Sequence, residues 1–379
     1  MSRVTRTHVS DARGVGRMLF DASAGIVDVV ERMHRTIERR PAPVGRPVVE
    51  STRGITGFVY RSVRGSMRVI GRGIDASLAP IEGLLPAGET TPGREVFVSI
   101  VNGVYGDYLA RTGNPLAIEM QILHDSTAPT DKLLVLAHGL CMSNQQWTRD
   151  GYSHGAALAD ALGFTPLYLR YNSGLPIAEN GRLLADRLET LVRNWPRPVR
   201  ELTILGHSMG GLVARSACLA AAERKLEWPQ SLRRLVFLGT PHHGAPLERG
   251  GHGLDYLLAL SPYSAPFTRL GKSRSAGIQD LRHGTITADG HRPVPLPANA
   301  SCYAVAASLG ERRSPLKDRV VGDGLVPLDS ALGRHTERAR ALRIPKQHRW
   351  VGFGMGHLEL LHRPEVYAQL HEWLATPAA

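Results

Sequence analysis

The chain has 379 residues, of which 42% are hydrophobic and 21% charged, and its formal net charge is +12. This composition is typical of a globular protein with a sizeable core and excludes a disordered or collagen-like chain. The three cysteines, Cys141, Cys218 and Cys302, lie far apart and show neither a disulfide framework nor the Cys/His spacing of a zinc site. We therefore expect a protein from a reducing compartment, without a metal or another cofactor.

Targeting signals are missing from the printed sequence. The first residues, MSRVTRTHVSDARG, contain arginines but no apolar segment that ends in a cleavage site. Nowhere does a run of about 18 apolar residues occur, which a membrane-spanning helix would need. We expect a cytoplasmic protein and leave peripheral attachment to a membrane open.

The first 90 residues differ from the rest of the chain in charge. Residues 1–80 hold fourteen arginines and no lysine against seven acidic residues. Proline- and glycine-rich segments at 39–49 (RRPAPVGRPVV) and 84–95 (LLPAGETTPGRE) read as linkers. We expect a basic, amphipathic helical extension over 1–90, followed by a domain over 91–379.

Within this extension, residues 55–74 have the pattern of a basic amphipathic helix. Arginines recur at steps of three and four at Arg61, Arg64, Arg68 and Arg72, while apolar residues recur on the opposite face. The helix could pack on the domain with its arginines in solvent, or it could dock on an anionic membrane. Binding to nucleic acid is the least favoured alternative, because no fold signature of a nucleic-acid-binding domain accompanies the charge.

From residue 118 onward, short apolar strands alternate with helical segments. This alternation is typical of an α/β fold with a mostly parallel sheet and helices on both faces. The strands are expected at 118–123, 133–139, 165–171, 202–208, 232–240, 302–308 and 349–354. The helices are expected at 153–162, 180–195, 209–224 and 364–375.

Residues 245–300 interrupt this alternation. They are rich in Gly, Pro, Ser and His and include LDYLLALSPYSAPF, which mixes leucine and aromatic residues. We expect a lid or cap insertion here, with an ordinary packed insertion as the alternative. His242 and His243, which precede it, lack carboxylate partners at metal-ligand spacing, and we expect them to be structural or to line a substrate pocket.

A glycine-framed serine provides the strongest indication of chemistry. Gly206-His207-Ser208-Met209-Gly210 has the G-x-S-x-G pattern, and it follows an expected strand and opens an expected helix. Small residues let the backbone reverse sharply there, and the helix N-terminus favours negative charge. We therefore expect Ser208 to be a nucleophile, which requires a base, a group to orient that base and donors for an oxyanion.

Five segments of the chain supply these groups in one order. They are LLVLAHGLCMS, GHSMGGLVARS, LGTPHHGAP, VVGDGLVP and GMGHLELL. With them, residues 118–379 resemble the α/β-hydrolase superfamily, and within it the lipase-like group related to bacterial triacylglycerol lipases and GPI inositol-deacylases. The first 90 residues are not covered by this resemblance.

The resemblance implies a catalytic triad in the order serine, acid, histidine. It assigns the acid to Asp323, in the turn Gly-Asp-Gly, with Asp318 and Asp329 as nearby alternatives. His357, in the turn after the last strand, is implied as the general base. The backbone N–H groups of Leu140 and Met209 are implied as the oxyanion hole. His138 is then expected to stabilise its turn, and Cys141 to serve in packing.

These residues together predict a serine hydrolase that cleaves carboxylic esters through an acyl-enzyme, with an acyl ester or lipid as substrate. An acyltransferase would use the same triad and replace water by an alcohol or amine. The third alternative is a non-catalytic scaffold at a lipid surface, dominated by residues 1–90. Any membrane contact is expected through residues 55–74.

Overall fold

The computed structural model describes residues 13–14, 16–18, 92–124, 128–245, 275–290, 292–311 and 322–376. Its contacts divide the chain into two compact units, one of Met1–Ser2, Thr91–Thr112 and Ala117–Ala379, and the other of Arg3–Thr90 and Gly113–Leu116. The predicted helix at 55–74 lies outside the described residues, as does most of the predicted 1–90 extension. In the second unit, Arg17 donates to the carbonyl of Gly113 and Asn114 donates to that of Gly14, both at 3.1 Å.

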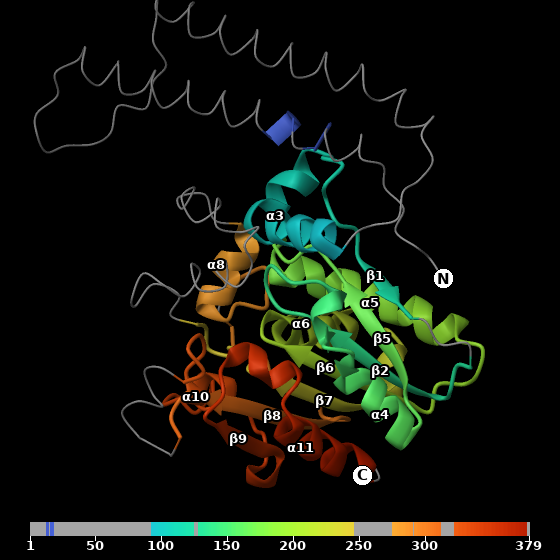
Figure 1. Cartoon of the computed structure of the whole chain (residues 1–379), viewed down its shortest axis with the longest axis vertical. Coiled ribbons are helices and arrows are strands. Elements are labelled where there is room, and N and C mark those ends of the chain that lie inside the picture. The colour runs from blue at the N-terminus through green and yellow to red at the C-terminus, as the bar shows by residue number, and fades with distance from the viewer. Residues whose placement is uncertain are drawn as a thin grey trace, which may run out of the picture. The chain divides into compact units, whose positions relative to one another are not determined.

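The first unit is built on a sheet of seven strands in the order β1-β5-β2-β6-β7-β8-β9 (Figure 1). All neighbouring pairs are parallel except β1 with β5. The strands are β1 (Gln121–Leu123), β2 (Lys132–Ala137), β5 (Thr165–Arg170), β6 (Glu201–His207), β7 (Leu232–Leu238), β8 (Ser301–Ser308) and β9 (Arg349–Phe353). Each lies within or beside a predicted strand, and the predicted α/β class with a mostly parallel sheet is confirmed.

The helices of the first unit include the four that were predicted. These four are α4 (His154–Leu162), α5 (Ile177–Asn194), α6 (Met209–Arg224) and α11 (Pro364–Ala375). The other elements are α3 (Pro92–Arg111), α8 (Ala276–His283), α10 (Leu328–Ala331), the short strands β3 (Thr148–Arg149) and β4 (Tyr152–Ser153), and the 3₁₀ turns η1 (Asn144–Trp147), η2 (Trp228–Ser231), η4 (Lys346–His348) and η5 (His357–Leu361).

Two hydrophobic cores hold the layers together, one on each face of the sheet. Helices α5 and α6 cover one face, where Leu184 and Leu212 pack with Val135 and Ile204 of the sheet. Helices α4 and α11 cover the other, where Leu158 and Leu370 pack with residues of alternate register. Figure 1 shows these helix pairs on opposite sides of the strands. Because successive strand residues point to opposite faces, near-continuous apolar strands are required here.

Helix α3 corrects the predicted linker at 84–95. The helix begins at Pro92 and runs through Arg111, with non-helical backbone at Tyr105. Proline suits the first turn of a helix because it has no N–H to leave unpaired. Glu95 of this helix is buried and accepts two hydrogen bonds of 3.1 Å from Arg170, at the end of β5. This buried ion pair ties the helix to the sheet edge at which the parallel strands end.

The predicted lid at 245–300 is described only in part. Residues 246–274 lie outside the described residues. The remainder contains α8, capped by Ser275, whose hydroxyl accepts from the N–H of Ile278. In the part of the chain that the structure describes, no helix is both long enough and apolar enough to cross a membrane.

Candidate active site

Ser208 sits in a sharp turn between β6 and α6. Its backbone has φ 53° and ψ −123°, a conformation that costs a non-glycine residue energy and is typical of a nucleophile elbow. Its N–H donates to the carbonyl of Leu238 at 2.8 Å, which ties the elbow to the end of β7. The turn thus presents Ser208 at the carboxyl edge of the central strand.

The glycines around Ser208 are required by close backbone contacts. A Cβ atom on Gly210 would lie 2.3 Å from the carbonyl oxygen of Ala137, and one on Gly206 would lie 2.5 Å from the Cα of Gly211. Both distances are far below any tolerated contact. The G-x-S-x-G pattern therefore reflects the packing of the elbow against β2 and against its own helix.

Asp323 and His357 are brought together from two other strands. Asp323 follows β8 and His357 follows β9, at the edge where β6 also ends. The Nδ1 of His357 lies 2.7 Å from Oδ2 of Asp323, and both side chains are buried. The backbone N–H of His357 also donates to the carbonyl of Asp323 at 3.1 Å. These two contacts fix the imidazole relative to the carboxylate.

The turn around Asp323 directs its two oxygens to different partners. Gly322 and Gly324 have φ of 51° and 94°, which glycine adopts without a steric cost. The Oδ1 atom accepts from the N–H groups of Leu325 and Val326, at 3.0 and 2.8 Å. Oδ2 is thereby left for His357. Of the alternatives, Asp318 lies outside the described residues, and Asp329 is half exposed and pairs with Arg334 at 3.6 Å.

His357 lies next to the serine elbow. A Cβ on Gly239, the residue after the one that accepts from Ser208, would be 3.0 Å from Cε1 and Nδ1 of the His357 ring. The ring of His207, which precedes Ser208, lies 4.7 Å from that of His357 between centroids. The predicted acid, base and nucleophile therefore meet at one edge of the sheet.

The turn after β2 lies against the same elbow. A Cβ on Gly139 would be 3.1 Å from the Cβ of Ser208, which places the buried Leu140 beside the nucleophile. Met209 is the first residue of α6, where backbone N–H groups have no acceptor within the helix. Both predicted oxyanion donors thus belong to segments that adjoin Ser208.

Comparison with known proteins adds a family and a fold. Residues 168–291, about a third of the chain, match the model of a family described as PGAP1-like alpha/beta domain. This region runs from β5 through the serine elbow and into α8 and the segment after it. The chain has the α/β-hydrolase fold. No curated protein sequence matches it.

Solved structures of the α/β hydrolases resemble the chain at low sequence identity. A lipase from Bacillus licheniformis in its mature form is 16% identical, over 68% of this chain and 98% of that one, with a TM-score of 0.44. An esterase from Pyrobaculum calidifontis is 15% identical, over 68% of this chain and 78% of that one, also with a TM-score of 0.44. A thioesterase of the prodiginine pathway from Streptomyces coelicolor is 14% identical, over 66% and 92%, with a TM-score of 0.38.

One residue of this hydrolase site is not apparent from its sequence pattern. His207 is fully buried, and its Nε2 lies 3.2 Å from the backbone carbonyl of His357. Burial, followed by the nearby His357, holds the pKa of His207 well below its usual value, so the ring is neutral and donates this hydrogen bond. In G-x-S-x-G the second residue is unrestricted, so the spacing gives no signal for this role.

The turn before Leu140 is held by His138 and Tyr171. Their rings stack at 4.3 Å, and the Tyr171 hydroxyl donates to the carbonyl of His138 at 2.7 Å. Cys141 packs beneath the turn, and burial raises the pKa of its thiol to about 12. His138 and Cys141 therefore have the structural roles that the sequence indicates for them.

Buried neutral histidines predict that the hydrolase loses stability in weak acid. Burial lowers the pKa of both His138 and His154 to about 4. The unfolded chain takes up these protons below a pH of about 6.5, so the free energy of unfolding should fall as the pH drops from about 6.5 towards 4. Each histidine contributes about 1.4 kcal/mol per pH unit in that window.

Urea unfolding at pH 7.5 and pH 5 measures this loss, which should exceed about 2 kcal/mol in total. In His154→Gln, an amide replaces an imidazole that lies 2.9 Å from the Tyr152 hydroxyl and 3.2 Å from the carbonyl of Leu360. This variant should lose less stability over the same range. An equal free energy of unfolding at the two pH values would show that these histidines are not buried in the neutral form.

Proposed function

We propose that the chain is a serine hydrolase that cleaves carboxylic esters, with Ser208, His357 and Asp323 as its catalytic triad. The observation that carries the proposal is the 2.7 Å contact between His357 and Asp323, at the sheet edge where Ser208 occupies a strained elbow. A serine hydroxyl needs such an oriented base to become a nucleophile. The chain supplies the base and the carboxylate that orients it from two separate strands.

The mechanism follows from the roles of the three side chains. The Ser208 Oγ attacks the ester carbonyl while Nε2 of His357 takes its proton. Asp323 accepts from Nδ1–H, which keeps Nε2 free to act as the base and stabilises the imidazolium. The protonated imidazole then gives its proton to the leaving alcohol, and an acyl group remains on Ser208. Water, deprotonated by His357, attacks this acyl-enzyme and releases the acid.

The negative charge of each tetrahedral intermediate falls on the former carbonyl oxygen. We assign its donors to the backbone N–H groups of Leu140 and Met209, on the two segments that adjoin Ser208. Donors that are fixed before the reaction stabilise such an oxyanion without reorganisation, which is often the largest contribution to catalysis. The N-terminus of α6 adds a favourable dipole.

The substrate class follows from the resemblance of the motifs to the lipase-like group. We propose lipid-like or medium-chain acyl esters. Hydrolysis of p-nitrophenyl esters from acetate to palmitate tests the reaction and defines the preferred chain length. Product analysis with added alcohols separates water from another acyl acceptor. If none of these esters is cleaved while the protein is folded, the proposed activity is wrong.

We further propose that residues 55–74 attach the hydrolase to anionic membranes. The support is the sequence pattern alone, in which arginines and apolar residues fall on opposite helix faces. The full chain should float with phosphatidylglycerol vesicles. Replacement of Arg61, Arg64, Arg68 and Arg72 by glutamine should return it to the soluble fraction, because each basic residue near such a surface adds about 1 kcal/mol.

A matched variant controls for net charge in the flotation assay. It replaces four exposed arginines of the domain by glutamine, namely Arg182, Arg187, Arg193 and Arg197. This variant should float like the unmodified chain. Equal recovery of all three proteins in the soluble fraction would remove the membrane proposal, and equal loss in both variants would assign the effect to net charge.

A further inference from the structure

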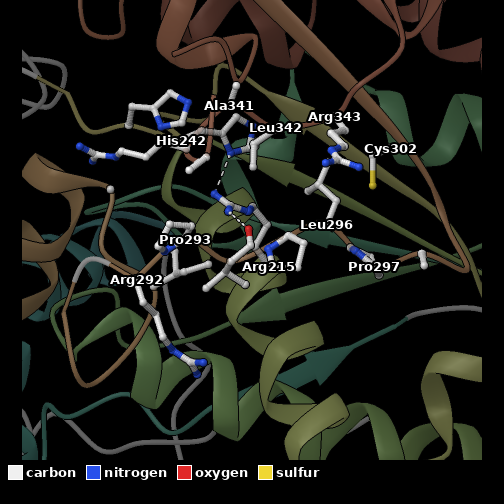
Figure 2. A pocket seen from close by; sticks show the side chains of 18 of the residues that line it. Arg215, His242, Arg292, Pro293, Leu296, Pro297, Cys302, Ala341, Leu342 and Arg343 are labelled. Carbon is white, nitrogen blue, oxygen red and sulfur yellow. Dashed lines mark hydrogen bonds between the residues drawn. The ribbon is translucent and has the colours of Figure 1, made fainter. Parts of the chain in front are cut away.

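A cavity of about 740 Å³ lies apart from the proposed catalytic residues (Figure 2). Its wall comes from three regions that are distant in sequence: α6 with Arg215, the segment from 283 to 302, and the segment from 338 to 348. Neither Ser208 nor Asp323 nor His357 lines it. A volume of this size accommodates a small organic ligand.

The lining of this cavity is strongly basic. Five arginines line it, Arg215, Arg292, Arg338, Arg340 and Arg343, and no described aspartate or glutamate does. Arg292 is compensated from outside by Glu223 and Asp289. Figure 2 shows its guanidinium turned away from Arg215. Arg338, Arg340 and Arg343 form no ion pair with any carboxylate in the described ranges.

Arg215 makes the charge imbalance acute, because it is buried with a relative exposure of 6%. Its Nη2 donates to the carbonyl of Val294 at 3.0 Å, and its Nη1 lies 3.4 Å from Nδ1 of His242. Its Nε has no hydrogen-bond partner among the described residues. Burial lowers the pKa of Arg215 to about 10, so it is still a cation at neutral pH. A buried cation without a counter-ion is costly, and proteins normally pair it.

His242 adds a second buried donor to the same wall. An arginine can only donate, so Nδ1 of His242 accepts and the neutral ring carries its hydrogen on Nε2. This Nε2 is buried and has no partner among the described residues. Arg215 and His242 therefore both line a basic cavity with an N–H group that lacks an acceptor.

We propose that this cavity binds the phosphate group of a small phosphorylated ligand. The planar guanidinium forks of Arg340 and Arg343 suit phosphate oxygens, and the anion would supply the counter-charge that Arg215 lacks. Apolar side chains of Pro293, Leu296 and Leu342 offer contacts for the organic remainder of the ligand. The proposal does not depend on the ester hydrolase activity, because none of the triad residues takes part.

Isothermal titration calorimetry on the full chain tests the proposal. The soluble probes are inorganic pyrophosphate and glycerol 3-phosphate, and the lipid probes are dihexanoyl phosphatidylglycerol and dihexanoyl phosphatidylcholine. The cavity variant is Arg340→Gln combined with Arg343→Gln, and Arg187→Gln combined with Arg197→Gln is the control with the same change in charge. Arg187 and Arg197 are exposed and do not line the cavity.

We expect at least one anionic probe to bind, and the cavity variant to weaken its affinity about tenfold or more while the control stays near the unmodified value. Binding of the soluble phosphates would assign the site to a phosphorylated metabolite, and binding of phosphatidylglycerol alone would assign it to a lipid headgroup. Three results would each overturn the proposal: no binding, equal effects of the two variants, or phosphatidylcholine binding as tightly as phosphatidylglycerol.

Discussion

Ser208→Ala should abolish ester hydrolysis while leaving the protein folded. The substitution removes the one atom that forms the covalent intermediate, and kcat should fall between about 10³- and 10⁶-fold. The fold should survive, because the elbow is held by the backbone hydrogen bond from Ser208 to Leu238 and by the glycine contacts, none of which needs the hydroxyl. Steady-state hydrolysis of the preferred p-nitrophenyl ester, with circular dichroism of both proteins, measures the effect.

Ser216→Ala is the matched control for this experiment. Ser216 lies further along α6 and is also buried, and its hydroxyl donates to the carbonyl of Ile286 at 2.8 Å. Its removal should lower the free energy of unfolding by about 1 kcal/mol and leave kcat within about twofold. If Ser208→Ala retains the activity of the unmodified chain, Ser208 is not the nucleophile.

Asp323→Asn should cost almost as much activity as the loss of the nucleophile, for a different reason. In the carboxylate, Oδ1 accepts from the N–H groups of Leu325 and Val326, and Oδ2 faces His357. An asparagine keeps the two backbone hydrogen bonds only if its carbonyl oxygen takes the place of Oδ1. Its amide NH₂ then points at His357 and donates to Nδ1, which forces the proton onto Nε2. A histidine in that tautomer cannot accept the serine proton, and kcat should fall about 10⁴-fold.

Asp329→Asn serves as the control for Asp323→Asn. Asp329 is close in sequence, but its side chain is half exposed and contacts Arg334. This variant should keep kcat within about twofold of the unmodified chain, since exposed ion pairs contribute little. Activity of Asp323→Asn within tenfold of the unmodified chain would mean that another group orients His357.

The sequence predicts the sheet and its cover helices well, because their signals are local. The strand that ends at His207 and the helix that begins at Met209 are uniformly apolar or small, and they flank a motif with strict backbone requirements. Asp323 and His357 were found through resemblance, since sixteen histidines are present and spacing alone does not select one. Their meeting follows from topology, because β6, β8 and β9 are parallel and end at one edge.

What the sequence does not reveal depends on contacts between distant segments. Helix α3 contains Gly103 and Gly106, which lower helix propensity. A Cβ on Gly103 would lie 2.3 Å from Sγ of Cys141, and one on Gly106 would lie 1.8 Å from Oδ1 of Asn172. Those glycines are explained only by partners far along the chain. The basic cavity is hidden in the same way, because its arginines come from separate segments.

The measurement that tests the central claim most directly is site mapping with a fluorophosphonate. Such a probe reacts with a serine only when a neighbouring base activates it, so labelling requires the arrangement of Ser208, His357 and Asp323 rather than any particular substrate. Peptide mass spectrometry of the labelled full chain should find one adduct, on Ser208, and Asp323→Asn should slow its formation strongly. An unlabelled Ser208 in the folded protein, or an adduct on another serine, would contradict the account.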